Sequence, residues 1–348
     1  MNRVSFLIIV IFSVLIASCD QKNKNSLPGD MDNTIYHMAK GYFIPMPELD
    51  LKSLSPDRKA MIKLGKKLFF DKRLSRNKNV NCASCHKIEK FGVDNLRISP
   101  GDEGQTGVRN TPSVFNAHLQ YAQFWSAHAR TVEEQSAGPI FGSFEMRMPD
   151  TLTLVTRLGS DKELIELFRE AFPNADTLIT IETIKIAIGA FERTLQTPGK
   201  FDDYLKGDLN ALTAAEKLGI KAFVDNGCIP CHSSTLVGGQ MAQKFALYGY
   251  YWDYTNSSYI DKGRFEKTED PGEKFVFKVP QLRNIGMTYP YFHDGSIDSL
   301  EEAIKIMGMS ESNIQLKDED VNNIAAFLRA LTGNIPDHAY ENNEIIFE

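Results

Sequence analysis

Four of the five cysteines in this chain lie in two copies of one short pattern, C-x-x-C-H, at residues 82–86 and 228–232. Two cysteines at this spacing can each bond to a vinyl group of haem, and the histidine that follows is then placed to bind the iron. The pattern therefore predicts two covalently attached c-type haems. The attachment residues would be Cys82, Cys85, Cys228 and Cys231, and the first axial ligands His86 and His232.

Zinc binding and dithiol redox chemistry are the competing interpretations of these cysteines. Zinc would require the two Cys-x-x-Cys pairs to meet at one ion, and a redox dithiol does not need a histidine after the second cysteine in both copies. Haem attachment explains both histidines. The ligand on the opposite face of each iron then decides the chemistry, because two filled positions favour electron transfer whereas an open one admits a small oxidant.

The fifth cysteine, Cys19, ends an apolar N-terminal segment. Residues 4–16 are apolar and follow Arg3, and the run is too short to span a bilayer. Its end, I-A-S-C, resembles a bacterial lipoprotein signal. We therefore expect residues 1–19 to be a lipoprotein-type signal peptide with lipidation at Cys19, the alternative being an ordinary signal peptide. The protein would then be exported, periplasmic and held to a membrane by its lipid alone.

The rest of the composition suits an exported globular protein. The chain has 348 residues, a formal net charge of −6 and no long basic run, so nucleic acid is not an expected partner. Residues 20–49 are expected to form a tether and N-terminal extension, with the polar stretch 20–32 flexible. With Cys19 assigned to the lipid, no cysteine pair is left for a structural disulfide.

An internal repeat extends well beyond the haem pattern. The sequence L-G-x-K-x-F-x-D precedes each copy, at residues 64–71 and 218–225, and I-x-A-F-x-R-x-L follows, at residues 188–195 and 324–331. Between them, the Arg-Asn pair at 109–110 matches the pair at 283–284. Phe124-Trp125 likewise matches Phe292-His293, which makes Trp125 and His293 equivalent positions.

Each unit thus reads as helix, haem pattern, irregular loops and helix, which is the order of a cytochrome c fold. We predict a mainly α protein with two cytochrome c-like domains, each carrying one covalently bound c-type haem. The boundaries are residues 50–198 (the first half) and 199–333 (the second half), joined at 197–200. Residues 334–348 form a C-terminal tail.

Further blocks, in order along the chain, resemble the bacterial dihaem cytochrome c peroxidases. They include R-N-T-P-S-V-F-N at 109–116, Q-F-W at 123–125, D-K-G-R-F at 261–265 and T-Y-P-Y-F-H at 288–293. The resemblance implies reduction of hydrogen peroxide to water with electrons from a small periplasmic cytochrome c or copper protein. It also implies a peroxidatic haem in the first half, an electron-entry haem in the second, and often a homodimer.

The resemblance assigns the second ligand of the electron-entry haem to Met307. A soft thioether favours Fe(II) and so raises the reduction potential. Met309 is a close competitor and Met287 a weaker one. A related dihaem enzyme, which matures a tryptophan-derived quinone cofactor, has tyrosine at this position. Met307 therefore weakens the interpretation of the chain as a peroxide-dependent oxidase of another substrate.

At the peroxidatic haem the resemblance assigns proton transfer to Glu145, with Gln135 as a hydrogen-bonding partner. A carboxylate can take a proton from one peroxide oxygen and return it to the other. Many members carry a histidine that caps this iron, but Asp102 occupies its position and residues 87–117 contain no histidine. We expect the first haem to be open as isolated, with His118 and His128 structural. If either histidine binds the iron, a dihaem electron-transfer protein is the better interpretation.

Two features are expected at the boundary between the halves. Trp125 is a candidate electron bridge between the haems, although an indole there also fills an interface. The resemblance further implies one calcium ion, bound by the side-chain oxygen of Asn110 and the backbone carbonyls of Thr288 and Pro290.

Overall fold

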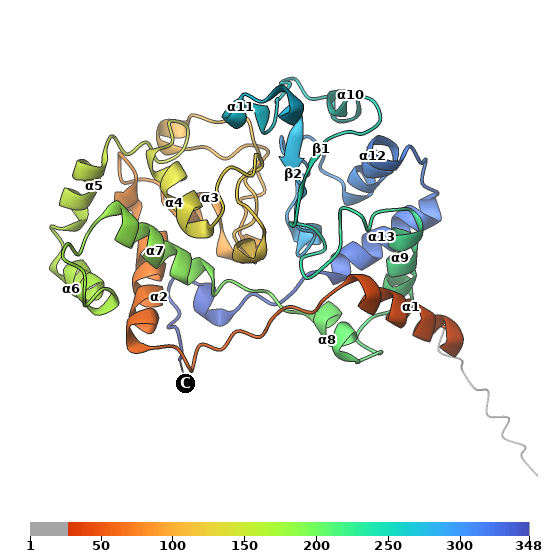
Figure 1. Cartoon of the computed structure of the whole chain (residues 1–348), viewed down its shortest axis with the longest axis horizontal. Coiled ribbons are helices and arrows are strands. Elements are labelled where there is room, and N and C mark those ends of the chain that lie inside the picture. The colour runs from red at the N-terminus through yellow and green to blue at the C-terminus, as the bar shows by residue number, and fades with distance from the viewer. Residues whose placement is uncertain (1–26, 348) are drawn as a thin grey trace, which may run out of the picture.

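The computed structural model describes residues 27–347 and is mainly helical, as predicted (Figure 1). The predicted signal peptide and Cys19 lie outside these residues. Within the described part of the chain, the only sheet pairs β1 (Ala242–Lys244) with β2 (Val276–Lys278) in antiparallel register. No helix in residues 27–347 is long and apolar enough to cross a bilayer.

The first half is built on two crossing helices, α2 (Pro56–Phe69) and α7 (Ile181–Glu192). Their apolar faces are buried against each other, as the spacing of the apolar residues predicts. At the crossing point, a Cβ on Gly65 would lie 1.8 Å from the carbonyl oxygen of Ala187. The glycine of the L-G-x-K pattern is therefore required for the close approach of the two helices.

The second half repeats this crossing with α9 (Ala214–Asp225) and α13 (Asp318–Ala330). A Cβ on Gly219 would lie 2.0 Å from the carbonyl oxygen of Asn323. Thr213 begins α9 with a capping box to Glu216, as its sequence predicts.

Further helices complete the two halves and are joined by the loops that matter for function. They are α3 (Cys82–Cys85), α4 (Val132–Phe141), α5 (Thr151–Leu158), α6 (Lys162–Ala171), α8 (Lys200–Lys206), α10 (Tyr251–Thr255), α11 (Phe265–Thr268) and α12 (Leu300–Ser312).

The two ends of the described chain each pack on the opposite half. Helix α1 (Gly29–Tyr42) buries Ile35 and Ala39 in the core of the second half. The C-terminal tail buries Ala339 and Ile345 in a core of the first half, and Figure 1 shows its end close to α2. The predicted flexibility of residues 20–32 is therefore wrong over residues 29–32, because these begin a helix that tertiary burial stabilises.

A pair of asparagines corrects the predicted register of the repeat. Asn116 and Asn284 both adopt the left-handed conformation, and each donates its side-chain amide to the hydroxyl of Thr197, at 2.9 and 2.8 Å. Asn116 is thus the equivalent of Asn284, and the predicted match with Asn110 is wrong. The predicted equivalence of Trp125 and His293 holds in the new register, since each follows its asparagine by the same number of residues.

Candidate haem sites

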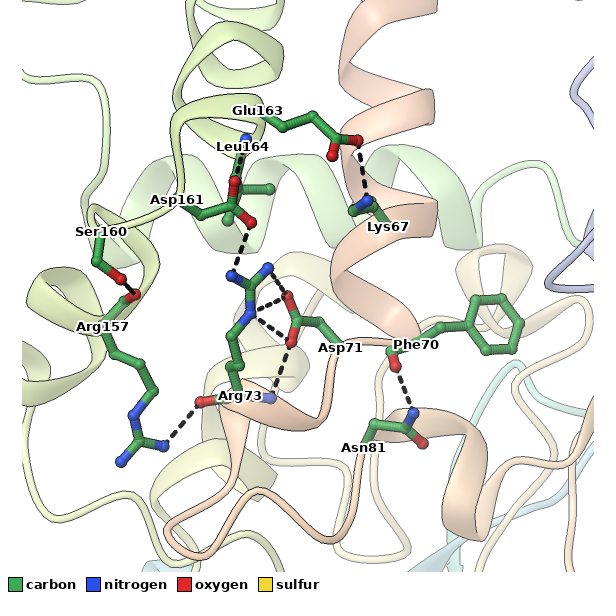
Figure 2. Close-up of polar contacts among 10 residues, drawn as sticks. All are labelled: Lys67, Phe70, Asp71, Arg73, Asn81, Arg157, Ser160, Asp161, Glu163 and Leu164. Carbon is green, nitrogen blue, oxygen red and sulfur yellow. Dashed lines mark hydrogen bonds and ion pairs between the residues drawn. The ribbon is translucent and has the colours of Figure 1, made fainter.

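The first haem pattern is fixed by polar contacts to the helices around it. Asn81 caps α3 and donates to the carbonyl oxygen of Phe70 at the end of α2, at 2.5 Å. Figure 2 shows Arg73 between the carboxylates of Asp71 and Asp161, at 2.6 and 2.8 Å. These bonds hold the segment before Cys82 against both α2 and the start of α6.

Both pattern histidines are oriented by a backbone carbonyl. The Nδ1 atom of His86 lies 3.1 Å from the oxygen of Gly92, and that of His232 lies 3.3 Å from the oxygen of Val237. A hydrogen bond from Nδ1 leaves Nε2 free to bind a metal. Burial lowers the pKa of both imidazoles, to about 4 for His232, and so favours the neutral form that coordinates iron.

A cavity of about 430 Å³ lies beside His232. Cys228, Cys231 and Met307 also line it, so the structure brings the second haem pattern and the predicted methionine ligand together. Met309 and Met287 are not among its described lining residues. The predicted interface residues also line this cavity: Asn110, Trp125, Thr288 and Pro290.

Lys278 gives the same cavity a buried positive charge that the sequence analysis missed. Its ammonium group donates to the side-chain oxygen of Gln120 at 2.6 Å, the one partner recorded for it among residues 27–347. Burial lowers the pKa of Lys278 to about 7. An anionic group nearby would stabilise the charged form of this amine, and haem carries carboxylates. The thiols, imidazole, thioether and ammonium of this site thus fit a c-type haem.

Glu145 and Gln135 come from one helix and the loop that follows it. Gln135 lies in α4, and the loop folds back on α4 through Met146, whose N–H donates to the oxygen of Pro139 at 3.0 Å. Burial is the main cause that raises the pKa of Cys85, and the nearby charge of Glu145 adds to it, which places Glu145 close to the first haem pattern. No hydrogen bond joins Glu145 to Gln135 in the described chain.

Burial raises the pKa of the Glu145 carboxyl, and the charge of Lys267 partly opposes this. The side chain nevertheless keeps access to solvent. Lys267 belongs to α11 in the second half, so both halves contribute to the electrostatics at Glu145. A raised pKa suits a group that must both accept and release a proton.

Asp102, at the position of the capping histidine, is fully buried and already engaged. Its carboxylate accepts from the backbone N–H of Asn77 at 3.1 Å and from the Asn77 side chain at 3.2 Å. Its own N–H donates to the oxygen of Glu145 at 2.7 Å. Asp102 therefore anchors its loop to the segment before the haem pattern and to the backbone of Glu145. No motif in the sequence indicates Asn77 as its partner.

The two candidate substitutes for the capping histidine, His118 and His128, both have neighbouring partners. His128 stacks on Phe124 with 4.3 Å between ring centroids, and its Nδ1 lies 2.8 Å from the hydroxyl of Ser126. Nε2 of His118 lies 3.3 Å from the side-chain amide of Gln196. These contacts favour structural roles for both.

Trp125 and His293 meet where the two halves join. The indole N–H donates to the backbone oxygen of Asn110 at 2.9 Å, and the N–H of Asn110 donates to the backbone oxygen of His293 at 2.7 Å. The rings of Trp125 and His293 are edge to face, 6.4 Å apart. The two equivalent positions of the repeat therefore contact each other.

Comparisons with known proteins agree with this architecture. A family model described as di-haem cytochrome c peroxidase matches residues 59–210. The cytochrome c551 peroxidase of Pseudomonas aeruginosa is 42% identical over 310 residues, covering 87% of this chain and 88% of that protein. The cytochrome c551 peroxidase of Nitrosomonas europaea is 40% identical over 292 residues, covering 84% and 85%.

Solved structures include a similar fold. The crystal structure of a MauG-like protein associated with microbial copper homeostasis superposes with a TM-score of 0.72 at 30% identity, covering 84% of this chain and 94% of that one. Given the extent and identity of the match to the two peroxidases, this chain belongs to the di-haem cytochrome c peroxidase family.

Proposed function

We propose that this cytochrome c peroxidase divides its reaction between two haems, with peroxide reduced beside His86 and electrons entering beside His232. When bound, c-type haem supplies the redox chemistry that no side chain here offers. Cys82 and Cys85 would attach the first haem, and Cys228 and Cys231 the second. The two halves, residues 50–198 and 199–333, would be two cytochrome c domains.

The observation that carries this proposal is a difference between two equivalent helices. Thr131 caps α4 and Ser299 caps α12, each accepting from a backbone N–H three residues on. Met307 lies eight residues after Ser299, and the residue eight after Thr131 is Pro139. Proline offers no side-chain ligand for iron. We therefore assign Met307 as the second iron ligand of the haem in the second half. The haem in the first half would receive no corresponding ligand from α4.

The loop that could otherwise cap the first iron supports the same assignment. The carboxylate of Asp102 is held by Asn77, and aspartate is in any case a weak ligand for haem iron. The first haem would therefore be open to peroxide in the oxidised protein.

Glu145 would move the proton in the reaction. Its carboxylate takes a proton from the near oxygen of peroxide and returns it to the far oxygen, while Gln135 donates a hydrogen bond. With two electrons and two protons, one hydrogen peroxide gives two waters. Solvent access to Glu145 and the shared origin of both residues in α4 and its loop support these roles.

Trp125 would connect the two haems electronically across the boundary between the halves. A calcium ion would order this boundary through Asn110, Thr288 and Pro290. The side-chain nitrogen of Asn110 donates to the backbone oxygen of Leu96 at 2.9 Å. The side-chain oxygen, Oδ1, takes no part in this hydrogen bond and suits calcium as a hard oxygen ligand.

The setting of the enzyme is part of the proposal. Electrons would come from a small cytochrome c or copper protein in the periplasm, and the enzyme would be held to a membrane through a lipid on Cys19. A homodimer is the expected assembly. These assignments follow from family membership and from the N-terminal sequence.

Steady-state peroxide reduction by the oxidised holoprotein tests the proposal, with a reduced small cytochrome c as donor. We expect turnover without any period of pre-reduction, and rapid cyanide binding to one haem. Turnover only after pre-reduction would contradict the open first haem. No turnover and no cyanide binding would identify an electron-transfer protein instead.

A further inference from the structure

Both tryptophans of the chain pack against one small cluster that includes Tyr251 and Phe277. Trp125 lines the cavity beside His232, whereas Trp252 lies in α10, which Figure 1 shows at the outer edge of the molecule. The rings of Tyr251 and His293 lie between the two indoles. The cluster thus extends from the haem cavity towards the surface.

Successive rings in this cluster are in contact, and together they form what we call the ring path. The centroid of Trp125 is 6.4 Å from that of His293, which is 4.9 Å from that of Tyr251. Tyr251 is 5.1 Å from Trp252, and Trp252 stacks on Tyr250 at 4.7 Å with their planes within 12°. Tyr251 is fully buried, but Tyr250 is 56% exposed. The ring path therefore reaches solvent at Tyr250.

Hydrophobic packing accounts for only part of this arrangement. Phe245, Phe275 and Phe277 fill the cluster, and their burial is sufficient reason for them. The same reason does not apply to Tyr250, which stacks on Trp252 while more than half of its surface faces water. The outer end of the path consists of the two aromatic types that lose an electron most easily.

The surroundings of the two tyrosines determine where an oxidation would end. A tyrosine that loses an electron also loses its phenolic proton. The hydroxyl of Tyr251 donates to the backbone oxygen of Asp261 at 3.1 Å, and a carbonyl oxygen cannot carry the proton away. Tyr250 is exposed to water, and water can carry the proton away. Tyr251 is thus suited to pass an electron on, and Tyr250 is suited to be the residue at which the oxidation ends.

We propose that Tyr250 is a surface oxidation site for phenolic one-electron donors, connected to the haems by the ring path. The proposal rests on the peroxide reduction proposed above. Tyr250 passes one electron inward and one proton to water, and a phenol then restores it by giving one electron and one proton. Two such events supply the two electrons for one hydrogen peroxide, so two phenols become two phenoxyl radicals and peroxide becomes two waters.

Rapid-freeze electron paramagnetic resonance of the holoprotein tests this, after mixing with hydrogen peroxide in the absence of a cytochrome donor. We expect a tyrosyl radical in the wild type and its loss in Tyr250→Phe and in Trp252→Phe. Tyr259→Phe is the matched control, because Tyr259 is 49% exposed and no ring contact is recorded for it in residues 27–347. The Tyr259→Phe variant should still form the tyrosyl radical.

A second readout uses hydroquinone as the donor. Tyr250→Phe should lose peroxide-driven hydroquinone oxidation and keep the turnover measured with a cytochrome donor. The proposal is overturned if the radical persists in Tyr250→Phe, or if wild-type protein reduces peroxide normally without forming a radical. A wild-type protein that reduces no peroxide with any donor would overturn the proposed function, and the surface site with it.

Discussion

Helices α4 and α12 occupy equivalent places in the two halves but end differently. In the second half, α12 continues beyond Met307 and presents it to the cavity beside His232. In the first half, α4 has Pro139 at the equivalent position and ends at Phe141. The chain then folds back and supplies Glu145 from a loop. The equivalent regions thus offer a thioether, the proposed iron ligand, in one half and a carboxyl, the proposed proton-transfer group, in the other.

The charged groups beside the two haem patterns also differ between the halves, in agreement with the difference between α4 and α12. The cavity of the second half contains the buried ammonium of Lys278, and a positive charge favours a haem that has gained an electron. The first half instead places a carboxyl with a raised pKa near Cys85. The electrostatics therefore suit electron entry at one haem and proton transfer at the other.

The largest effect is expected from Glu145→Gln, which keeps the shape of the side chain but cannot take up a proton. Loss of a general acid–base group costs about 10²- to 10⁴-fold in rate. The turnover number for peroxide should fall by this amount while both haem spectra stay unchanged. Glu103→Gln is the control, since Glu103 is an exposed carboxylate in a salt bridge with Arg147. A Glu145→Gln enzyme of near wild-type rate would remove Glu145 from the reaction.

The pH profile sharpens this prediction. The carboxylate must be deprotonated to accept a proton, so the rate should fall as pH drops through the pKa of Glu145. Because burial raises that pKa, the loss should occur at a higher pH than the ordinary value of about 4.3. The residual activity of Glu145→Gln should not show this fall in rate at low pH.

The next largest effect is expected from Met307→Leu. Without the thioether, the reduction potential of the second haem should fall, within the span of roughly 0.8 V that axial ligands command. The enzyme should then no longer accept electrons from its donor. Spectroelectrochemistry measures the potential, and Met309→Leu is the matched control from the same helix. Equal shifts in both variants, or a shift in Met309→Leu alone, would contradict the assignment.

A smaller effect is expected from Trp125→Phe, which keeps an aromatic ring in the interface but removes the indole and its hydrogen bond to Asn110. Electron transfer from the second haem to the first should slow, as stopped-flow spectra of a half-reduced protein would reveal. Loss of one hydrogen bond costs only about 1 kcal/mol, so the fold should survive. An unchanged transfer rate would leave Trp125 a packing role alone.

The smallest effect is expected from Lys278→Met. Removing a buried positive charge should lower the reduction potential of the second haem by less than Met307→Leu does. Lys278→Arg keeps the charge and should restore most of the potential. Potentiometric titration distinguishes them, and a potential that does not change in Lys278→Met would place the ammonium too far from the haem to matter.

Much of this arrangement could be predicted from sequence because it depends on local patterns. The haem pattern fixes ligand and attachment residues within five positions, and the two glycines Gly65 and Gly219 stand in a repeated pattern that marks the helix crossings. Met307 could be named as the candidate ligand because its position in Ile306-Met307-Gly308, fourteen residues after His293, resembles the family pattern.

The remaining features depend on contacts between distant residues. The repeated Arg-Asn pair matched Asn110 with Asn284 in the sequence. The left-handed backbone of Asn116 and its hydrogen bond to Thr197, which Asn284 shares, instead identify Asn116 as the equivalent of Asn284. The polar sequence of α1 gives little sign that it is buried by the opposite half. The lysine in the apolar run 276–280 was the one available signal for the charge in the cavity.

The central claim is that the first haem is open although the second is closed. Electron paramagnetic resonance and optical spectra of the oxidised holoprotein, taken without any reductant, test it most directly. We expect one low-spin haem with histidine and methionine ligands, and one high-spin haem that binds cyanide or peroxide at once. Two low-spin haems, one of them with two nitrogen ligands, would contradict the account.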